Sequence, residues 1–311
     1  MSVLLTILPL FAVIALGFVS IRTGYISAAH IRPVGDFVIK VALPALIFQA
    51  VTALPVDEAL NWRFIGAYAG GSLAVFTVGL VLARHVMRLH LGAAAMVGLG
   101  MSTSNSGFMG YPIALTVIGA GAGPLLAQCM VVENVLMLPL ALALAEGAGR
   151  GHGWRAVARA MRGVLSNPII LALFAALTVS ATGLPVPAVI DEAIGMLARI
   201  APPVALFVLG GTVAALPMAG VRANAGMIVL GKLILHPLAV LAALLVTPGI
   251  DGWMLVGGVI FAAAPMLSIY PLFGQRVGIE MLTATALLIA VAASFLTLSA
   301  WITGMTRAVG F

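Results

Sequence analysis

Few residues in this 311-residue chain could do chemistry, and the clearest group interrupts an apolar run. The segment SNSGFMGYPIA, residues 104–114, lies in a stretch without a charged residue between Leu91 and Val132. Its proline, two glycines and asparagine should break a helix at a depth where no water satisfies the released backbone groups. Free N–H, hydroxyl and amide groups at one point can bind a small anion. The segment therefore predicts an anion-binding site at a broken helix.

A second set of polar residues lies within other apolar runs. Glu133 and Asn134 fall near the middle of one run, and Lys232 and His236 lie one turn apart in another. A charge at membrane depth is costly and usually faces protein or a cavity. Glu133 is a candidate to bind a proton, a cation or a basic partner, whereas the alternative for the set is a buried structural hydrogen-bond network. An imidazole can titrate near neutral pH, but His236, alone and followed by a proline, is more simply a packed core residue. We place Gln128 in the same polar network.

The composition fixes the setting of these residues. Hydrophobic residues make up 63% of the chain and charged residues 8%, whereas charged residues are roughly a quarter of a soluble protein. With a mean hydropathy of +1.21, the chain is predicted to be a polytopic membrane protein. The net charge of +6 does not indicate a nucleic-acid partner, because the arginines lie in the connections between apolar runs. The single cysteine, Cys129, excludes an intrachain disulfide and a cysteine metal cluster, and we expect neither a metal nor a cofactor.

The apolar runs predict membrane-spanning helices and their orientation. The N-terminal MSVLLTILPLFAVIALGF has no Lys or Arg before its apolar core, so we expect a spanning helix rather than a signal peptide. Runs of about 20 residues predict ten helices, near 2–21, 34–54, 61–84, 92–119, 122–146, 164–182, 188–215, 223–247, 252–275 and 279–305. The inner connections then hold most of the basic residues, including Arg22, Arg32, Arg84, Arg88, Arg150, Arg155, Arg159, Arg162, Arg222 and Arg276. The outer connections hold Asp57, Glu58, Asp191, Glu192 and Asp251. The positive-inside rule therefore places both termini on the non-cytoplasmic side of the membrane.

Two further patterns concern contacts between or within helices. Asp36 and Lys40 have the spacing of an ion pair on one helix face. Gly66, Gly70 and Gly71 predict a face on which two helices pack closely.

The chain divides into two halves of similar pattern. A basic connection at 147–163 separates residues 1–146 from residues 164–311, with five predicted helices in each half. An odd number of helices per half gives the halves opposite orientations, so they should form an inverted repeat. A constant offset of 159 positions aligns VALPALIF with IAPPVALF and GYP with IYP. The predicted fold class is therefore an all-α polytopic membrane protein of ten helices in two inverted five-helix repeats.

Matched interruptions of the fourth and ninth helices, near 104–111 and 264–270, are predicted to cross at the membrane midplane and form a transporter binding site. Pro112 and Pro271 each suit the first turn of a second half-helix, whose free N–H groups would attract a small anion. We expect Asn105 to donate its side-chain amide to a carboxylate, and glycines to allow close backbone approach. The alternative is a pair of proline kinks repaired by neighbouring helices. The predicted substrate-binding residues are Ser104, Asn105, Ser106, Gly107, Gly110, Pro112, Pro265, Ser268, Tyr270 and Pro271.

The interrupted segments also carry a family resemblance. SNSGFMGYPIAL and AAAPMLSIYPLFGQRVGIE resemble the two helix-breaking motifs of the auxin efflux carrier family, whose bacterial members are often described as malonate transporters. FVIKVALPALIFQ, QCM and LSNPI match that family in the same order. The resemblance implies a crossover fold like that of NhaA and the bile-acid symporters, with a scaffold domain and a mobile transport domain each drawn from both repeats. It implies a homodimer in the bacterial cytoplasmic (inner) membrane that moves a small organic anion, such as malonate or an auxin-like indole acid, by an elevator-type motion. It also implies that Asn105 and the two crossover prolines line the substrate site.

One departure from the family concerns the coupling ion. The plant members have an aspartate and a lysine four residues apart in the third helix, where this chain has Tyr68 and Ser72. We therefore favour proton coupling or movement of the anion driven by the membrane potential, with Glu133 as the titratable group. A sodium-coupled organic-anion symporter and, with less support, an anion channel are the alternatives. An enzyme is not expected, because the chain has no HExxH, no GxSxG and no paired aspartates within its helices.

Overall fold

The fold is helical throughout the ranges that the structure describes. We analysed a computed structural model, which describes residues 3–53, 60–147, 162–163, 165–216 and 223–310. Within these ranges the chain forms helices, turns and short connections, and no strand occurs. The helices are α1 (Val3–Arg22), α2 (Ile31–Phe37), α3 (Leu43–Thr52), α5 (Trp62–His85), α6 (Leu91–Ser102), α7 (Tyr111–Ile118), α8 (Ala122–Val131), α9 (Leu138–Gly147), α11 (Pro168–Thr182), α12 (Ala188–Ala215), α13 (Ala223–Leu230), α14 (His236–Leu245), α15 (Gly252–Ala263), α16 (Tyr270–Arg276) and α17 (Glu280–Val309). The prediction of an all-α chain is confirmed.

Length and composition make many of these helices suitable for a membrane. Seven helical stretches are long and apolar enough to cross one, namely Leu5–Arg22, Ala28–Thr52, Trp62–His85, Leu91–Ala145, Ala188–Ala215, Ala223–Leu245 and Glu280–Val309. The apolar helices α11 and α15 are shorter. Most of the basic connection at 147–163 lies outside the described residues, as do Arg222, Asp57 and Glu58.

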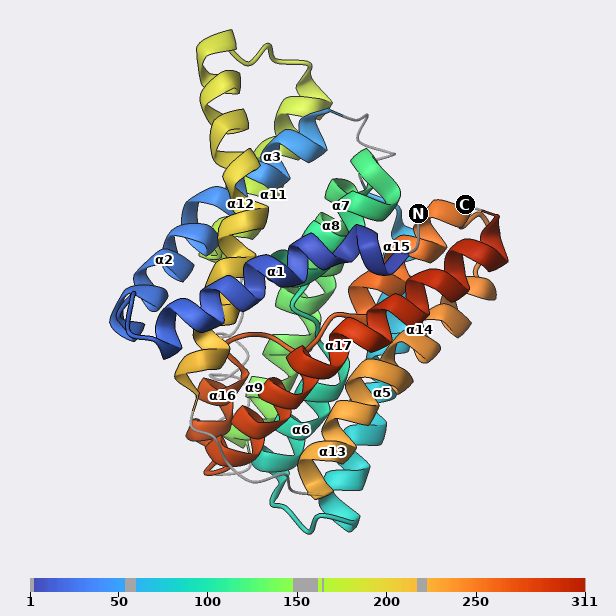
Figure 1. Ribbon diagram of the computed structural model, residues 1–311. Coiled ribbons are helices and arrows are strands. Elements are labelled where there is room, and N and C mark those ends of the chain that lie inside the picture. Colours follow the sequence, from blue (N-terminus) through green and yellow to red (C-terminus); the bar gives the residue numbers. More distant parts are fainter. Residues whose placement is uncertain (1–2, 54–59, 148–161, 164, 217–222, 311) are drawn as a thin grey trace.

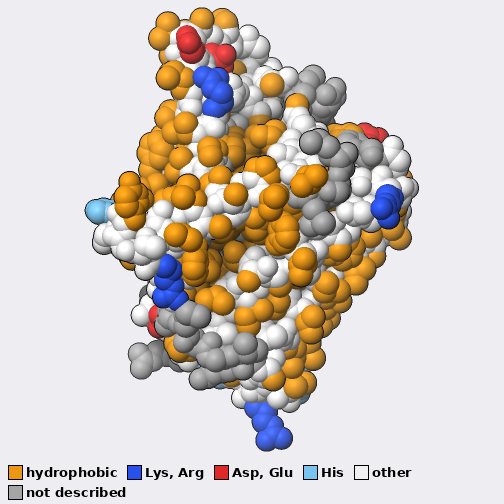
Figure 2. Space-filling model, in the orientation of Figure 1, with side chains coloured by type: hydrophobic (Ala, Val, Ile, Leu, Met, Phe, Trp, Pro, Cys, Tyr) orange, Lys and Arg blue, Asp and Glu red, His pale blue; other side chains and the backbone are white. Residues whose placement is uncertain are grey.

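The outer surface agrees with a lipid environment. Figure 2 shows apolar side chains over most of the visible face, with charged side chains mainly at its margins. Leu16 on α1, Phe174 on α11 and Leu296 on α17 are 60%, 57% and 68% exposed. Large aliphatic and aromatic side chains exposed over such an area are typical of a surface that contacts lipid. The chain is therefore a multi-pass membrane protein.

Two groups of helices pack together (Figure 1). In the first group, α1, α3 and α11 lie against one another or against α12. In the second group, α5 packs against α6 and α14, and α17 packs against α13, α15 and α16. The groups meet where α3 contacts α8 and where α1 contacts α7 and α17.

Glycines permit the closest helix contacts. A Cβ atom added at Gly17 of α1 would strike the carbonyl oxygen of Phe207 in α12, and one at Gly210 would strike that of Ile14. Small residues of this kind let two membrane helices approach backbone to backbone. The prediction for α5 is correct at Gly71, where a Cβ atom would lie 2.8 Å from Cα of Val240 in α14.

The same prediction is wrong at two neighbouring positions of α5. A Cβ atom at Gly66 or at Gly70 would meet no atom within 4 Å. The packing face of α5 is therefore set by a single glycine of the three, because the other two point away from the contact with α14.

In the described ranges, four π-helical turns each end two residues before a proline. They are Val38–Ala42 before Pro44, Ser106–Gly110 before Pro112, Val132–Met137 before Pro139, and Gly231–Leu235 before Pro237. A proline has no N–H, and its ring clashes with the carbonyl four residues earlier. A wider turn moves that carbonyl away, so the helix continues past the proline. Proline alone is not sufficient, because Pro9 in α1 and Pro202 in α12 lie in ordinary α-helix.

Two helices are interrupted more completely. Residues 103–105 separate α6 from the π turn that begins at Ser106, and residues 264–269 separate α15 from α16. The first interruption is shorter than the predicted 104–111, because the chain is already helical six positions before Pro112. Pro271 lies in the first turn of α16, as predicted.

Candidate functional site

The two interruptions meet at a small pocket. The backbone N–H of Asn105 donates to the carbonyl oxygen of Pro265 over 2.7 Å. Its side-chain Nδ2 donates to Oγ of Ser268 over 2.6 Å, although these residues are 163 positions apart. A pocket of about 240 Å³ adjoins this contact and is lined by Ile39, Leu43, Asn105, Ser106, Gly107, Phe108, Met130, Glu133, Asn134, Leu138, Asn167, Ile169, Leu267, Ser268 and Ile269.

Glu133 directs its carboxylate at the first interruption. Its Oε1 atom accepts hydrogen bonds from Oγ of Ser106 over 2.6 Å, from N of Ser104 over 3.3 Å and from the hydroxyl of Tyr68 over 3.4 Å. The side chain is only 3% exposed. Hydrogen bonds to a carboxylate are about twice as strong as those between neutral groups. This carboxylate therefore holds the chain at Ser104 and Ser106 where the helix resumes.

Lys232 is fully buried on the other side of Ser104. Its Nζ atom lies 2.6 Å from Oγ of Ser104, 2.7 Å from the carbonyl oxygen of Ala262 and 2.7 Å from Nδ1 of His236. Nδ1 of His236 also lies 3.1 Å from the carbonyl oxygen of Ala262. When Nζ is an ammonium group, which only donates, Nδ1 accepts from it and Nε2 carries the ring proton. In that tautomer Nε2 donates to Oγ of Ser72, 2.9 Å away. The pair Lys232 and His236 therefore belongs to one network of buried polar groups.

Ser104 joins the two buried ionisable side chains. Its N–H donates to Glu133 while its hydroxyl oxygen accepts from Lys232. The direct ion pair in the described part of the chain is instead Lys40 with Asp36, 3.2 Å apart on the exposed surface, which confirms the spacing argument. Glu133 and Lys232 are thus linked through a serine at the broken helix rather than by a salt bridge.

The pocket gathers only part of the predicted binding set. Asn105, Ser106, Gly107 and Ser268 line it. Gly110 instead faces α15, where an added Cβ atom would lie 2.8 Å from Cδ1 of Phe261.

Other predicted residues lie behind or away from the pocket. Tyr270 packs over Gly100, and its hydroxyl donates to the carbonyl oxygen of Met96 over 3.0 Å. Gln128 accepts a hydrogen bond from the backbone N–H of Asn61 over 3.2 Å, at the start of α5. The remaining predicted residues that do not line the pocket are Ser104, Pro112, Pro265, Pro271, Lys232 and His236.

Sequence reasoning missed Asn167 as a lining residue. Its Oδ1 atom accepts from N of Ile169 over 2.9 Å and so caps α11, while its Nδ2 donates to Oδ1 of Asn134 over 3.2 Å. An asparagine followed by Pro168 signals a helix start. Nothing in that signal shows that the cap faces Asn134 across a pocket.

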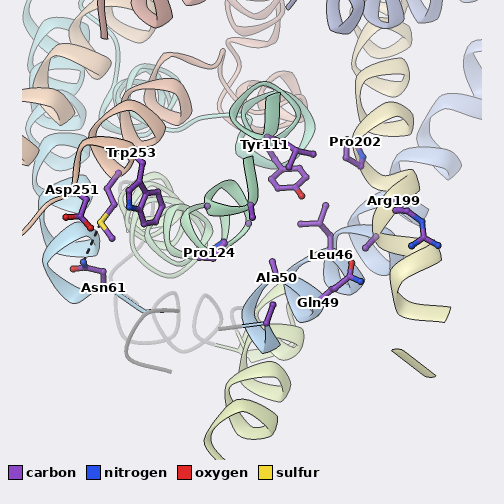
Figure 3. Close-up of a pocket in the computed structure, with 17 residues that line it drawn as sticks. Leu46, Gln49, Ala50, Asn61, Tyr111, Pro124, Arg199, Pro202, Asp251 and Trp253 are labelled. Atoms are coloured by element: carbon purple, nitrogen blue, oxygen red, sulfur yellow. Dashed lines mark hydrogen bonds between the residues drawn. The ribbon is translucent and has the colours of Figure 1, made fainter. Parts of the chain in front are cut away.

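A larger hollow of about 860 Å³ lies at the other end of the same helical stretch. Figure 3 shows Tyr111, Leu46, Gln49 and Trp253 around it, with the Gln49 side chain turned toward Arg199. Whereas residues 105–108 line the small pocket, Tyr111 and Leu115 line the larger hollow. The stretch from Ser106 to Ile118 therefore separates two hollows.

Comparisons with known proteins agree with a membrane transporter. A family model described as "Membrane transport protein" matches residues 2–302. A "Putative malonate transporter" of Rhizobium meliloti (strain 1021) is 29% identical over 286 residues, which cover 91% of this chain and 89% of that protein. The "Uncharacterized transporter YfdV" of Escherichia coli (strain K12) is 24% identical over 246 residues, 76% of each chain.

A third protein matches over a shorter part of the chain. The "Lysosomal cholesterol signaling protein" of Mus musculus is 28% identical over 109 residues, which cover 34% of this chain and 12% of that protein. The match of the family model over nearly the whole length decides the assignment. The chain belongs to the membrane transport protein family of the auxin efflux carriers.

Proposed function

We propose that the protein is a secondary transporter that binds a small organic anion in the 240 Å³ pocket and moves it across the cytoplasmic membrane. The observation that carries this proposal is the meeting of two helix interruptions at the pocket, through the bonds from Asn105 to Pro265 and Ser268. Discontinuous helices that meet inside a membrane protein are the usual place for a transporter's substrate.

The lining of the pocket favours a small anion. The amides of Asn105, Asn134 and Asn167, with two N–H groups each, and the hydroxyl of Ser268 can donate hydrogen bonds there. Glu133 is the ionisable residue among the lining residues described, so we propose that the anion binds while this carboxyl group carries its proton. Neutral donors bind a carboxylate weakly enough to release it. The volume is below the roughly 300–1,000 Å³ of pockets for drug-sized ligands. A short carboxylate such as malonate suits this size, and the similar protein named as a malonate transporter supports that choice.

The packing supports an alternating-access mechanism. We propose that α1, α2, α3, α11 and α12 form the scaffold, and that the remaining helices carry the two interruptions as the transport domain in an elevator-type motion, with the pocket at the boundary between the two groups. The hollows on either side of the stretch from Ser106 to Ile118 would open in turn to the two compartments. A homodimer through the scaffold is part of this proposal.

An inverted repeat of 1–146 and 164–311 is proposed as the origin of the paired interruptions. The contact between Asn105 and Pro265 supports it, since the two positions fall almost at the 159-residue offset. Figure 1 shows the start of α1 and the end of α17 at the same side of the molecule. By the positive-inside rule this side is the non-cytoplasmic one. Reporter fusions at both ends in a bacterial host would test the orientation.

A flux assay tests the function. Purified protein in liposomes should take up labelled malonate with saturation, and internal unlabelled malonate should accelerate that uptake by exchange. Empty liposomes are the control, and an indole acid is the comparison substrate. Conductance that grows linearly with anion concentration and shows no exchange would instead favour a channel.

A further inference from the structure

We propose that the ammonium group of Lys232 is a built-in cation, which occupies a site at the end of α15 that would otherwise take a small inorganic cation such as Na⁺. The inference rests on the proposed function, since its consequence is that transport of the organic anion proceeds without Na⁺. It concerns a buried cluster that adjoins the substrate pocket but does not line it.

The ligands around Nζ are complete. An ammonium group has three donors and no acceptor. The oxygen of Ser104, the oxygen of Ala262 and Nδ1 of His236 lie 2.6, 2.7 and 2.7 Å from Nζ. Nδ1 also lies 3.1 Å from the oxygen of Ala262, and in the tautomer with the proton on Nε2 all three atoms are acceptors for Nζ. Lys232 is 0% exposed, so no bulk water replaces any of them. The nitrogen is therefore surrounded as a bound cation would be.

The position of the site explains why a cation belongs there. Ala262 lies in the last turn of α15, which ends at Ala263, and its carbonyl has no partner further along that helix. The C-terminal end of a helix carries about half a negative charge. In transporters with broken helices, such ends and unwound carbonyls are where coupling cations bind. In this chain the ammonium group of Lys232 occupies the position at the carbonyl oxygen of Ala262 where such a cation would bind.

A carboxylate completes the charge balance. Glu133 is joined to Lys232 through Ser104. Without the ammonium, a helix end, a hydroxyl oxygen and an imidazole would be left around one buried point, with the carboxylate of Glu133 on the far side of Ser104. Oxygen ligands with a nearby carboxylate suit a hard cation. A cation at this point therefore balances Glu133 whenever that carboxyl group is ionised.

The helix that bears Lys232 is placed for this role. Gly231 precedes it in the π turn, and an added Cβ atom there would strike Cε of Met101 in α6. A glycine at this position lets the backbone approach α6, so the lysine stem is close enough to reach Ser104. The opposite side of His236 is held by Ser72 of α5.

Thermal unfolding of detergent-purified protein tests the proposal without any substrate. Wild type should unfold at the same temperature in NaCl, KCl and choline chloride of equal ionic strength. Lys232→Ala should unfold several degrees lower in choline chloride. Na⁺ or ethylammonium should raise that temperature with a saturable concentration dependence, because a ligand that binds only the folded state stabilises it. Lys232→Met, which keeps most of the stem, should respond to Na⁺ in the same direction.

Controls and contrary outcomes are defined by the same assay. Lys40→Ala removes an exposed lysine and should show no preference among the three salts. Stabilisation of wild type by Na⁺ would overturn the proposal. So would Lys232 variants that respond to no cation, or that fold in none of the three salts. If wild type transports no carboxylate while the variants respond to Na⁺, the proposed function fails and the cation site stands. If wild type takes up malonate only with Na⁺, the proposed function stands and the built-in cation fails.

Discussion

The side chain of Asn105 in one helix interruption donates a hydrogen bond to the side chain of Ser268 in the other. In the substrate complex, we expect its Nδ2 to donate to the carboxylate. Loss of one hydrogen bond to a charged group costs about 1.5–3 kcal/mol, or roughly 10- to 100-fold in affinity. Asn105→Ala should weaken malonate binding by that factor, as measured by calorimetry on folded protein. Ser299→Ala, which removes a buried hydroxyl of α17 bonded to Phe295, is the control. Unchanged affinity in Asn105→Ala would place the substrate elsewhere.

Glu133 is the proposed group for proton coupling. An imposed pH gradient should change the initial rate of wild-type malonate uptake at fixed membrane potential. In Glu133→Gln an oxygen can still accept from Ser106, but the proton-binding charge is gone, so the rate should no longer respond to the gradient. Asp36→Asn, which alters an exposed carboxylate, should respond as wild type does. A pH response that survives in Glu133→Gln would assign the coupling to another group.

At this scale the sequence identified polar residues that the structure buries, but not their partners. Glu133 and Lys232 stand out because charges are rare in apolar runs. Their contacts could not be predicted, because Lys232 reaches a serine 128 positions away and a backbone carbonyl that any residue could supply. The sequence marks Tyr68 and Ser72 only as departures from the family, although each forms a hydrogen bond with a member of the buried network.

The interrupted helices could be predicted because their cause is local. Proline, glycine and asparagine in an apolar run break the helix wherever the fold places it. The π turns could not be predicted from proline alone, since Pro202 and Pro9 have none. The difference must lie in how each helix packs, which the local sequence does not contain.

The contact of α1 with α12 gives a prediction about stability. In Gly210→Leu the new side chain would collide with the main-chain oxygen of Ile14, and that oxygen cannot move without separating the helices. We expect a loss of about 1–3 kcal/mol, as for other overpacked sites, seen as a lower unfolding temperature. Gly226→Leu is the matched control, because an added Cβ atom there meets nothing within 4 Å. Equal stability of the two variants would mean that the close contact contributes little.

For the whole molecule, the proposed motion of one helix group against the other can be blocked. A Cβ atom at Gly123 of α8 would touch Cβ of Ala50 in α3, beside the larger hollow of Figure 3. In a background with Cys129→Ala, the only native cysteine is absent. Ala50→Cys with Gly123→Cys, bridged by Hg²⁺, should then lose malonate uptake and regain it with a thiol reductant. Each single cysteine variant is a control. Full uptake by the bridged protein would show that these groups do not slide past each other.

The main-chain bond from Asn105 to Pro265 has a consequence for how the protein tolerates mutation. Its donor and acceptor are backbone atoms, so no exchange of side chain removes them, except proline at position 105, which lacks the N–H. Substitutions of the residues that determine substrate specificity can therefore leave the contact between the two broken helices intact. In this way, a few substitutions can adapt one fold to different anions while the backbone contact between the interruptions stays the same.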